Sequence, residues 1–419
     1  MHWKNHPGGA LTALLILHLL AHIDRNMLLG FSPQIIADLH LNQAQYGFLV
    51  GAVWVLSFGF MAIFMGTLAD RYSRPRILAC GLLIWSVCTW LSGYAQGFGQ
   101  MVAARFFVAS GEAALVPVAT ALLSELFSER RRGSAIGIFF MGIPLGIGCS
   151  FLLAGSLGAA SGWRNTFFAL GVTGVLLALP LVLLKDDRKG ATAPRGEPFA
   201  RQIGAVLATV RRIAALRNII IGFVLIHMVF ASLAFSQLWL VSERGFDASG
   251  IALRIGALQL VFGTLGALAG GVLGDRAARR LPGGHAGFMV LLVALCGPLM
   301  LAYRFSAPGS PLFYAGMCAG SFLPMAVYGP ANGSIMALAP ASMRATMTGF
   351  TMMTINVVAI ALGNLAVGAA SDYLNKAGTA APLTKVLLTC DMLAILSILF
   401  FHLAARAAKA PAHFTPEPA

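Results

Sequence analysis

The sequence has little charge and no motif of known catalytic chemistry. Only 11% of the 419 residues are Asp, Glu, Lys or Arg, whereas a soluble protein averages about 25%. So low a charge content excludes an ordinary water-soluble enzyme of this length, because too much apolar surface would face water. The six cysteines form no CxxC pair, and the motifs HExxH and GxSxG are absent. We therefore expect no metal, no cofactor and no enzymatic activity.

Apolar sequence, by contrast, is abundant, at 58% of the chain. A membrane-spanning helix needs about 20 apolar residues, and twelve runs of suitable length occur. They lie near 10–36, 45–69, 77–96, 100–127, 134–158, 162–184, 218–242, 249–274, 286–305, 310–338, 346–371 and 384–405. We predict an all-α membrane protein with twelve transmembrane helices in two pseudo-symmetric bundles. The predicted domains are a six-helix bundle at 1–184, a linker at 185–217, a second bundle at 218–405 and a tail at 406–419.

The net charge of +14 follows the predicted loops and is not concentrated in a polar, nucleic-acid-binding domain. If the N-terminus is cytoplasmic, 21 of the 29 lysines and arginines lie on the cytoplasmic side and six, Arg304 among them, lie on the other. Arg25 and Arg105 fall inside apolar runs. Because cytoplasmic loops are enriched in Lys and Arg, both termini and the linker are expected to be cytoplasmic. We expect a monomer in the plasma or inner membrane, with no nucleic-acid partner.

Two short sequences recur at nearly the same spacing. GTLADR at 66–71 follows the second run, and GVLGDR at 271–276 follows the eighth. Arg132 precedes Gly137 by five residues after the fourth run, and Arg344 precedes Gly349 by five after the tenth. Matching offsets at matching membrane depth indicate a duplicated six-helix half.

The stretch GTLADRYSRPR resembles the signature between the second and third helices of the major facilitator superfamily. This resemblance implies two six-helix bundles that rock about a central site by alternating access. It also implies a conformational switch formed by Gly66, Asp70, Arg71 and Arg74, with a second copy at Gly271, Asp275 and Arg276. The alternative is that these arginines only enforce topology.

Four charged residues lie near the middle of predicted spans. Asp24 and Arg25 are in the first, and Arg105 and Glu112 are seven positions apart on one face of the fourth. A charge at the bilayer centre costs at least about 2.5–3.5 kcal/mol, so the four are expected to compensate one another around an aqueous cavity. Asp24 and Glu112 are the candidate proton carriers. Arg25 and Arg105 are the candidate ligands of an anion. The alternative is an ion-pair cluster that only holds the bundle together.

Other polar residues in the spans are weaker candidates. Those predicted to contact the substrate are Gln237, Tyr328, Asn332 and Asn356. Pro330 between Tyr328 and Asn332 predicts a break in the tenth helix. Asp391 stands as a lone acid in the twelfth. His18 and His22, one turn apart in the first span, are interpreted mainly as packed histidines.

Five segments resemble the Spinster branch of the superfamily: DRNML, GTLADR, ARFFVASGEA, ERRRGSAIGIFFMGIPLG and GWRNTFF. Asp24, Arg25, Arg105 and Glu112 fall on the acid and arginine positions of that branch. The resemblance implies a proton-coupled transporter of an anionic amphipathic substrate, a lysolipid or a sphingolipid-like molecule. An alternative is a proton-coupled symporter of a small organic anion, because sialin-like carriers share several of these features.

Overall fold

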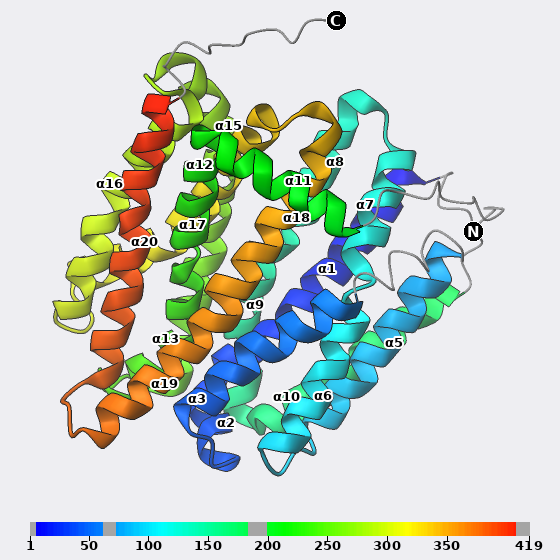
Figure 1. The fold of residues 1–419 in the computed structure, drawn as a ribbon. Helices are drawn as coiled ribbons and strands as arrows, with labels where there is room; N and C mark the ends of the chain where they lie inside the picture. Colours follow the sequence, from blue (N-terminus) through cyan, green and yellow to red (C-terminus); the bar gives the residue numbers. More distant parts are fainter. Residues whose placement is uncertain (1–5, 62–72, 183–198, 408–419) are drawn as a thin grey trace, which may run out of the picture. The chain divides into compact units, whose positions relative to one another are not determined.

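The computed structural model describes residues 6–61, 73–182 and 199–407. In these ranges every regular element is a helix (Figure 1). Twelve helical stretches are long and apolar enough to cross a membrane: Pro7–Gly30, Gln43–Met61, Arg74–Ser92, Phe98–Leu126, Arg131–Gly155, Leu157–Leu181, Ala214–Ser242, Ala248–Arg280, Gly284–Phe305, Pro311–Leu338, Thr346–Lys376 and Pro382–Ala407. The predicted fold class is confirmed, while the orientation of the termini stays a prediction.

Several spans are divided into shorter elements. The elements are α1 (Pro7–Gly30), α2 (Ser32–Asp38), α3 (Gln43–Gly47), η2 (Phe48–Ala52), α5 (Arg74–Ser92), α6 (Phe98–Glu112), α7 (Leu115–Leu126), α8 (Glu129–Phe140), α9 (Gly142–Gly155), α10 (Leu157–Val182), α11 (Phe199–Arg212), α12 (Ala214–Ile226), α13 (Met228–Ser242), α14 (Ala248–Leu258), η3 (Gln259–Gly263), α15 (Thr264–Arg280), α16 (Gly284–Phe305), α17 (Pro311–Leu338), η4 (Ala341–Met343), α18 (Arg344–Ile355), η5 (Asn356–Leu362), α19 (Gly363–Lys376) and α20 (Pro382–Ala407). Of the four η elements, η2, η3 and η5 are π-helical and η4 is a 3₁₀ turn.

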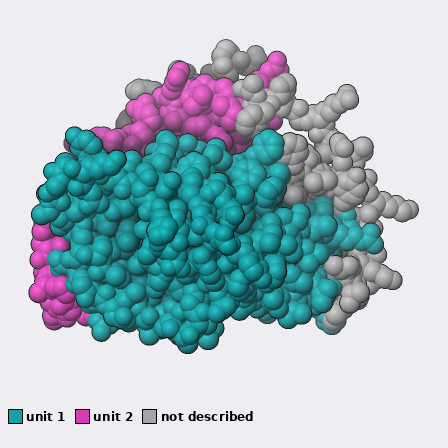
Figure 2. Space-filling model, turned by 90° about the horizontal axis from the view of Figure 1, so that it is seen from below, with its two compact units in different colours: residues 1–195, 230–264, 356–389 teal, residues 196–229, 265–355, 390–419 magenta. Residues whose placement is uncertain are grey.

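Internal contacts divide the chain into two compact units (Figure 2). The first unit consists of residues 1–195, 230–264 and 356–389, and the second of residues 196–229, 265–355 and 390–419. The first unit therefore combines the N-terminal half of the sequence with two segments of the C-terminal half. The division into bundles at 1–184 and 218–405 stays a prediction.

Local sequence sets where the helices begin. Pro7 and Pro311 occupy the first turns of α1 and α17, where the missing N–H of proline costs no hydrogen bond. Ser310 caps α17 by accepting a hydrogen bond from the backbone N–H of Phe313. Asp247 caps α14 in the same way. Such caps satisfy backbone donors that a helix leaves unpaired at its N-terminus.

Two spans are also divided close to a proline. The fourth span stops at Glu112 and resumes as α7 at Leu115, with Pro117 in its first turn. The fifth span breaks at Met141, three residues before Pro144. A proline ring excludes the carbonyl of the residue four positions earlier from helical hydrogen bonding. Glu112 is thereby placed at the end of a helix within the span.

The predicted break at Pro330 is wrong. Helix α17 runs unbroken through Pro330. The missing N–H of Pro330 leaves the carbonyl of Ala326 without its helical donor. Gly270 of α15 lies against this carbonyl so closely that a Cβ at Gly270 would collide with its oxygen. Helix α15 thus packs closely on α17 at the turn where the helical hydrogen bond is missing.

In the first unit, segments from the two halves of the sequence meet through glycine. Gly47 of α3 lies against the backbone of Asn364 in α19, where a Cβ would collide with the carbonyl oxygen. Gly256 of α14 lies against Gly148 of α9, and a Cβ at Gly256 would lie 2.8 Å from the Gly148 carbonyl oxygen. Small residues permit this backbone approach in membrane proteins.

A carboxylate reinforces the contact between α3 and α19. Asp372 of α19 accepts hydrogen bonds from the backbone N–H groups of Gln43 (3.1 Å) and Ala44 (2.9 Å). These N–H groups belong to the first turn of α3 and have no acceptor within their own helix. The negative charge of Asp372 also complements the positive end of the helix dipole.

The close approach of α5 and α6 yields a first prediction. A Cβ at Gly111 of α6 would lie 2.8 Å from the backbone nitrogen of Trp85, whereas nothing lies within 4 Å of one at Gly99 in the same helix. Gly111→Ala is expected to lower the free energy of unfolding by about 1–3 kcal/mol through overpacking. Gly99→Ala, the matched control, should leave it nearly unchanged. Thermal unfolding of the purified protein checks this, and equal stability of Gly111→Ala and wild type would contradict it.

Candidate functional site

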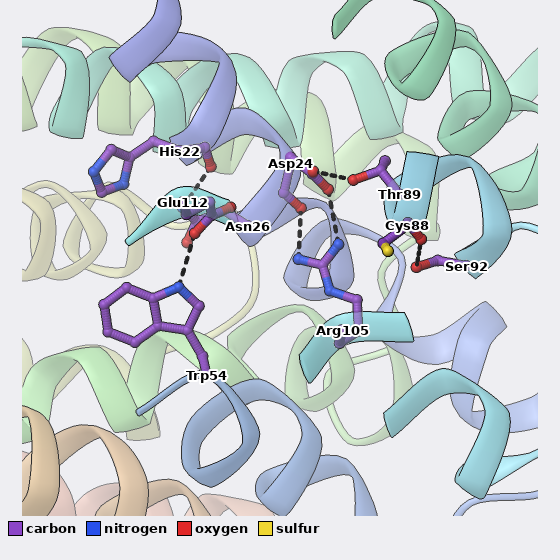
Figure 3. A network of polar contacts seen from close by, with 9 residues as sticks. All are labelled: His22, Asp24, Asn26, Trp54, Cys88, Thr89, Ser92, Arg105 and Glu112. Carbon is purple, nitrogen blue, oxygen red and sulfur yellow. Dashed lines mark hydrogen bonds and ion pairs between the residues drawn. The ribbon is translucent and has the colours of Figure 1, made fainter. Parts of the chain in front are cut away.

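Three helices of the first unit, α1, α5 and α6, meet at a buried ion pair (Figure 3). Arg105 donates from Nη1 to Oδ1 of Asp24 at 2.8 Å, and from Nη2 to the backbone carbonyl of Asp24 at 3.3 Å. The Thr89 hydroxyl of α5 donates to the other carboxylate oxygen. Asp24 is 1% exposed and Arg105 5% exposed. The predicted pairing of charges between the first and fourth spans thus exists as a direct contact of Asp24 with Arg105.

The other two charges of the predicted set meet on the indole of Trp54. The indole Nε1–H donates to Oε2 of Glu112 at 2.8 Å. The Arg25 guanidinium carbon lies 3.5 Å from the centroid of the indole, a cation–π geometry. Glu112 is 5% exposed, and its Oε1 has no hydrogen-bond partner among the described residues. Arg25 and Glu112 are therefore bridged by a ring and do not pair directly.

Trp54 and Thr89 were missed by the sequence prediction. A tryptophan or threonine within an apolar run is common, and neither carries a charge that would single it out. Trp54 lies in the second span, seven positions after Gly47 of α3, and Thr89 lies near the end of α5. Their roles depend on which helices pack together, and sequence spacing within one span does not contain that information.

The histidines of α1 belong to helix packing. Nδ1 of His18 lies 2.9 Å from the backbone oxygen of Phe139, just before the break between α8 and α9. The His18 ring also stacks on the ring of Phe139 with centroids 4.2 Å apart. His22 contacts His18 edge to face, with 4.8 Å between centroids. This agrees with the interpretation of both residues as packed histidines.

The comparisons with known proteins agree with this architecture. A family model described as "Major Facilitator Superfamily" matches residues 14–364. The chain belongs to the major facilitator superfamily. It is a multi-pass membrane transporter of that superfamily, which confirms the family predicted from GTLADRYSRPR.

Individual relatives refine the comparison. "Protein spinster" of Drosophila melanogaster is 26% identical over 280 residues, which is 65% of this chain but only 46% of that protein. "Sphingosine-1-phosphate transporter SPNS2" of Xenopus tropicalis is 23% identical over 426 residues, covering 95% of this chain and 82% of the relative. "Probable sulfoacetate transporter SauU" of Cupriavidus necator is 28% identical over 303 residues, covering 69% of this chain and 70% of the relative.

A solved structure extends the similarity to the whole fold. It is that of a bacterial homolog of the human lysosomal transporter Spinster in an inward-facing, unoccupied conformation, with a TM-score of 0.81 and 22% identity. The match covers 96% of this chain and 97% of that chain. Together with the sequence relatives, it confirms the predicted resemblance of this superfamily member to the Spinster branch.

The remaining predicted substrate contacts of this major facilitator protein are dispersed. Gln237 of α13 is fully buried and donates to the carbonyl of Ala248 at 2.6 Å. Asn356 is half-buried at the start of η5. Tyr328 and Asn332 belong to the second unit, where the Asn332 amide donates to the Tyr328 carbonyl at 2.9 Å. Within the first unit, no hydrogen bond among the described residues joins Gln237 to the Asp24–Arg105 pair, and the substrate role of all four residues stays a prediction.

The predicted conformational switch is described only in part. Gly66, Asp70 and Arg71 lie outside the described residues. Arg74 at the start of α5 is buried and pairs with Glu125 of α7 at 2.9 Å.

In the second copy, Gly271 and Arg276 are exposed on α15. Asp275, between them in the same helix, lies 3.4 Å from Nε2 of His285. Of the predicted switch arginines that the structure describes, Arg74 is the one seen paired with an acid, Glu125.

Two residues of the second unit correct the sequence interpretation. The sequence analysis counts Arg304 among the charges of the non-cytoplasmic side and interprets Asp391 as a lone acid. Instead, Arg304 of α16 donates from Nε to Oδ2 of Asp391 in α20 at 2.7 Å, and both are 1% exposed. Position 304 sits near the end of a run, where hydropathy does not distinguish a loop arginine from a buried one.

The Arg304–Asp391 pair is predicted to be structural. Removing one partner of a buried pair leaves an uncompensated charge and costs about 3–5 kcal/mol, whereas replacing both with apolar residues can be neutral. Asp391→Leu is therefore expected to lower the thermal unfolding temperature, and Arg304→Leu combined with Asp391→Leu should restore most of the loss. Additive destabilisation in the double variant would contradict this interpretation.

Proposed function

We propose that this protein is a proton-coupled secondary transporter that moves an anionic amphipathic substrate, a lysolipid or sphingolipid-like molecule, by alternating access. The observation that supports the proposal most strongly is the cluster of two acids and two arginines on α1 and α6, with Asp24 and Arg105 in direct contact. Charges inside membrane spans are costly and typically mark substrate and proton pathways.

The arginines provide the chemistry for binding an anion. A guanidinium presents five N–H donors in a planar fork that suits a phosphate or carboxylate. Among the described residues, no carboxylate lies within ion-pair distance of Arg25, and its guanidinium lies over the Trp54 ring. An anion bound at Arg25 would thus gain charge-assisted hydrogen bonds without first breaking an ion pair.

The same geometry offers a route to proton coupling. Arg105 donates two hydrogen bonds to Asp24, so an incoming anion that competes for Arg105 weakens the stabilisation of the Asp24 carboxylate. A buried carboxylate that loses its cationic partner binds a proton more readily. Anion binding and proton binding then favour each other, which is the linkage a symporter needs.

Alternating access is supported by the contacts between the two halves of the sequence within the first unit. The glycine contacts of α3 with α19 and of α9 with α14 lie at the helix ends that the positive-inside count assigns to the non-cytoplasmic side. We infer that this end is closed in the present conformation and that Asp372 holds it closed through α3.

A small organic anion is the alternative substrate. It is favoured by the similarity to the probable sulfoacetate transporter, which has a higher identity than the Spinster relatives reported above. A thermal-shift screen of the purified protein with sphingosine-1-phosphate, lysophosphatidylglycerol, sulfoacetate and L-galactonate at two pH values separates the two. Stabilisation by the lipids supports the main proposal, and stabilisation by the small acids alone supports the alternative.

Substitutions in the cluster should separate coupling from binding. Asp24→Asn and Glu112→Gln are expected to flatten the pH dependence of uptake of the stabilising anion into proteoliposomes, because neither amide can carry the proton. Glu129→Gln, an exposed acid on α8, is the matched control. Wild-type pH dependence in both cluster variants would exclude these carboxylates as proton carriers.

Arg105 should determine affinity. Arg105→Lys keeps the positive charge but loses the planar set of guanidinium N–H donors. We expect the affinity of this variant for the stabilising anion to fall at least about tenfold, because a charge-assisted bidentate contact is lost. Arg280→Lys at the exposed end of α15 is the control. Unchanged affinity of a folded Arg105→Lys would reassign Arg105 to structure alone.

The Asp372 contact yields a conformational prediction. Two charge-assisted hydrogen bonds at a helix N-terminus contribute about 1–3 kcal/mol, so Asp372→Ala should shift the equilibrium towards a state open at this end by about tenfold. Spin labels at Ala37 and Asn375, both exposed, in a cysteine-free background would report longer distances. Asp247→Ala removes a cap within α14 and should leave these distances unchanged. An unchanged distance distribution in Asp372→Ala would contradict the inference that Asp372 holds this end closed.

A further inference from the structure

One aromatic side chain contacts both a cation and an acid of the cluster. The face of the Trp54 indole lies 3.5 Å from the Arg25 guanidinium carbon, and its Nε1–H lies 2.8 Å from Oε2 of Glu112. The ring is half-buried, and it comes from the second span, whereas Arg25 and Glu112 come from the first and the fourth. Figure 3 shows the indole reaching Glu112 from its own helix.

Without the ring, Arg25 and Glu112 would be natural partners for each other. They carry opposite charges, are buried or half-buried, and lie on helices that also meet at Asp24 and Arg105. In a low-dielectric site such a pair would satisfy both groups and consume the donors of the arginine. Trp54 instead gives the carboxylate one N–H donor and gives the guanidinium a π face, which occupies none of its N–H groups.

We propose that Trp54 is a positioning residue that keeps Arg25 and Glu112 apart, so that the donors of Arg25 stay available to an anion while Glu112 keeps one carboxylate oxygen open to a proton. This inference rests on the proposed function. It extends that function to a residue whose N–H contacts the proposed proton carrier Glu112 and whose ring face contacts the proposed anion ligand Arg25. The unpartnered Oε1 of Glu112 among the described residues is consistent with it.

The two contacts of Trp54 can be removed one at a time. Trp54→Phe keeps an aromatic face and loses the N–H donor, and Trp54→Leu loses both. Trp90 of α5 offers the matched control, because it packs on Tyr94 and Phe168 and is 37% exposed. The corresponding Trp90→Phe and Trp90→Leu variants therefore remove the same atoms outside the cluster.

The first measurement needs no substrate. The infrared C=O band of protonated Glu112, assigned by its disappearance in Glu112→Gln, is titrated with pH in the detergent-purified protein. The other charged groups facing Glu112 are Asp24 and Arg25 from α1 and Arg105 from its own helix, and they are unchanged in the tryptophan variants.

Loss of a hydrogen bond to the ionised form favours the protonated form. We therefore expect the midpoint to rise by about one pH unit in Trp54→Phe, and not in Trp90→Phe. An unmoved midpoint would overturn the role of the N–H.

The second measurement concerns Arg25. Affinities for sphingosine-1-phosphate and sulfoacetate are compared between Trp54→Leu and Trp54→Phe. Without the ring Arg25 can pair with Glu112, and binding of whichever anion the wild type binds should weaken by about fivefold because that pair must first be broken. Equal affinities would overturn the role of the face, and if neither anion binds, the infrared titration still decides the proposal.

The failure of this inference is distinguishable from the failure of the proposed function. If Glu112→Gln abolishes the pH dependence of uptake, but the midpoint is unmoved in Trp54→Phe and Trp54→Leu binds the anion as tightly as Trp54→Phe, the transporter assignment stands and the positioning role is refuted. If Glu112→Gln transports with wild-type pH dependence, proton coupling through Glu112 is refuted, whether or not the Trp54 variants shift the midpoint of the Glu112 titration.

Discussion

The arrangement of this protein depends on the need to compensate charge inside the membrane. Each ion in a span must find a partner or water, because an isolated charge there costs several kcal/mol. The chain meets this demand differently in its two units. In the first, Asp24 and Arg105 pair while Arg25 and Glu112 share an indole. In the second, Arg304 and Asp391 pair on two helices. In the first set the indole lies between Arg25 and Glu112, whereas in the second the two charges pair directly and Arg304 also lies over the Tyr303 ring.

On this difference we propose a transport role for the first cluster and a structural role for the second pair. The Arg304–Asp391 pair joins α16 to α20, and we expect it to tolerate joint replacement by apolar residues. The first cluster has a carboxylate oxygen of Glu112 without a partner among the described residues, and a guanidinium whose N–H groups face no carboxylate there. Groups left incompletely paired at a cost in stability are expected where a ligand or a proton completes them.

Much of the fold followed from the sequence, because hydropathy and loop charge report directly on the bilayer. The sequence predicted the twelve spans, the family and a mutual compensation of the four mid-span charges, but not which acid pairs with which arginine. What the sequence could not specify depends on packing between helices. Trp54 is one of many aromatic residues in apolar runs, Arg304 lies near the end of such a run, and α17 continues through Pro330 where Gly270 of α15 packs on it. The predicted contacts of Gln237, Tyr328, Asn332 and Asn356 rested on polarity alone, which does not identify a common cavity.

The central claim is that anion movement and proton movement are linked through Asp24 and Glu112. Its most direct test uses proteoliposomes that contain the protein and an internal pH-sensitive dye, to which the anion that stabilises the protein is added without a pre-formed pH gradient. The account predicts a substrate-driven change of internal pH in the wild type, which is lost in the variant that combines Asp24→Asn with Glu112→Gln. Anion uptake by the wild type without any change of internal pH would contradict it.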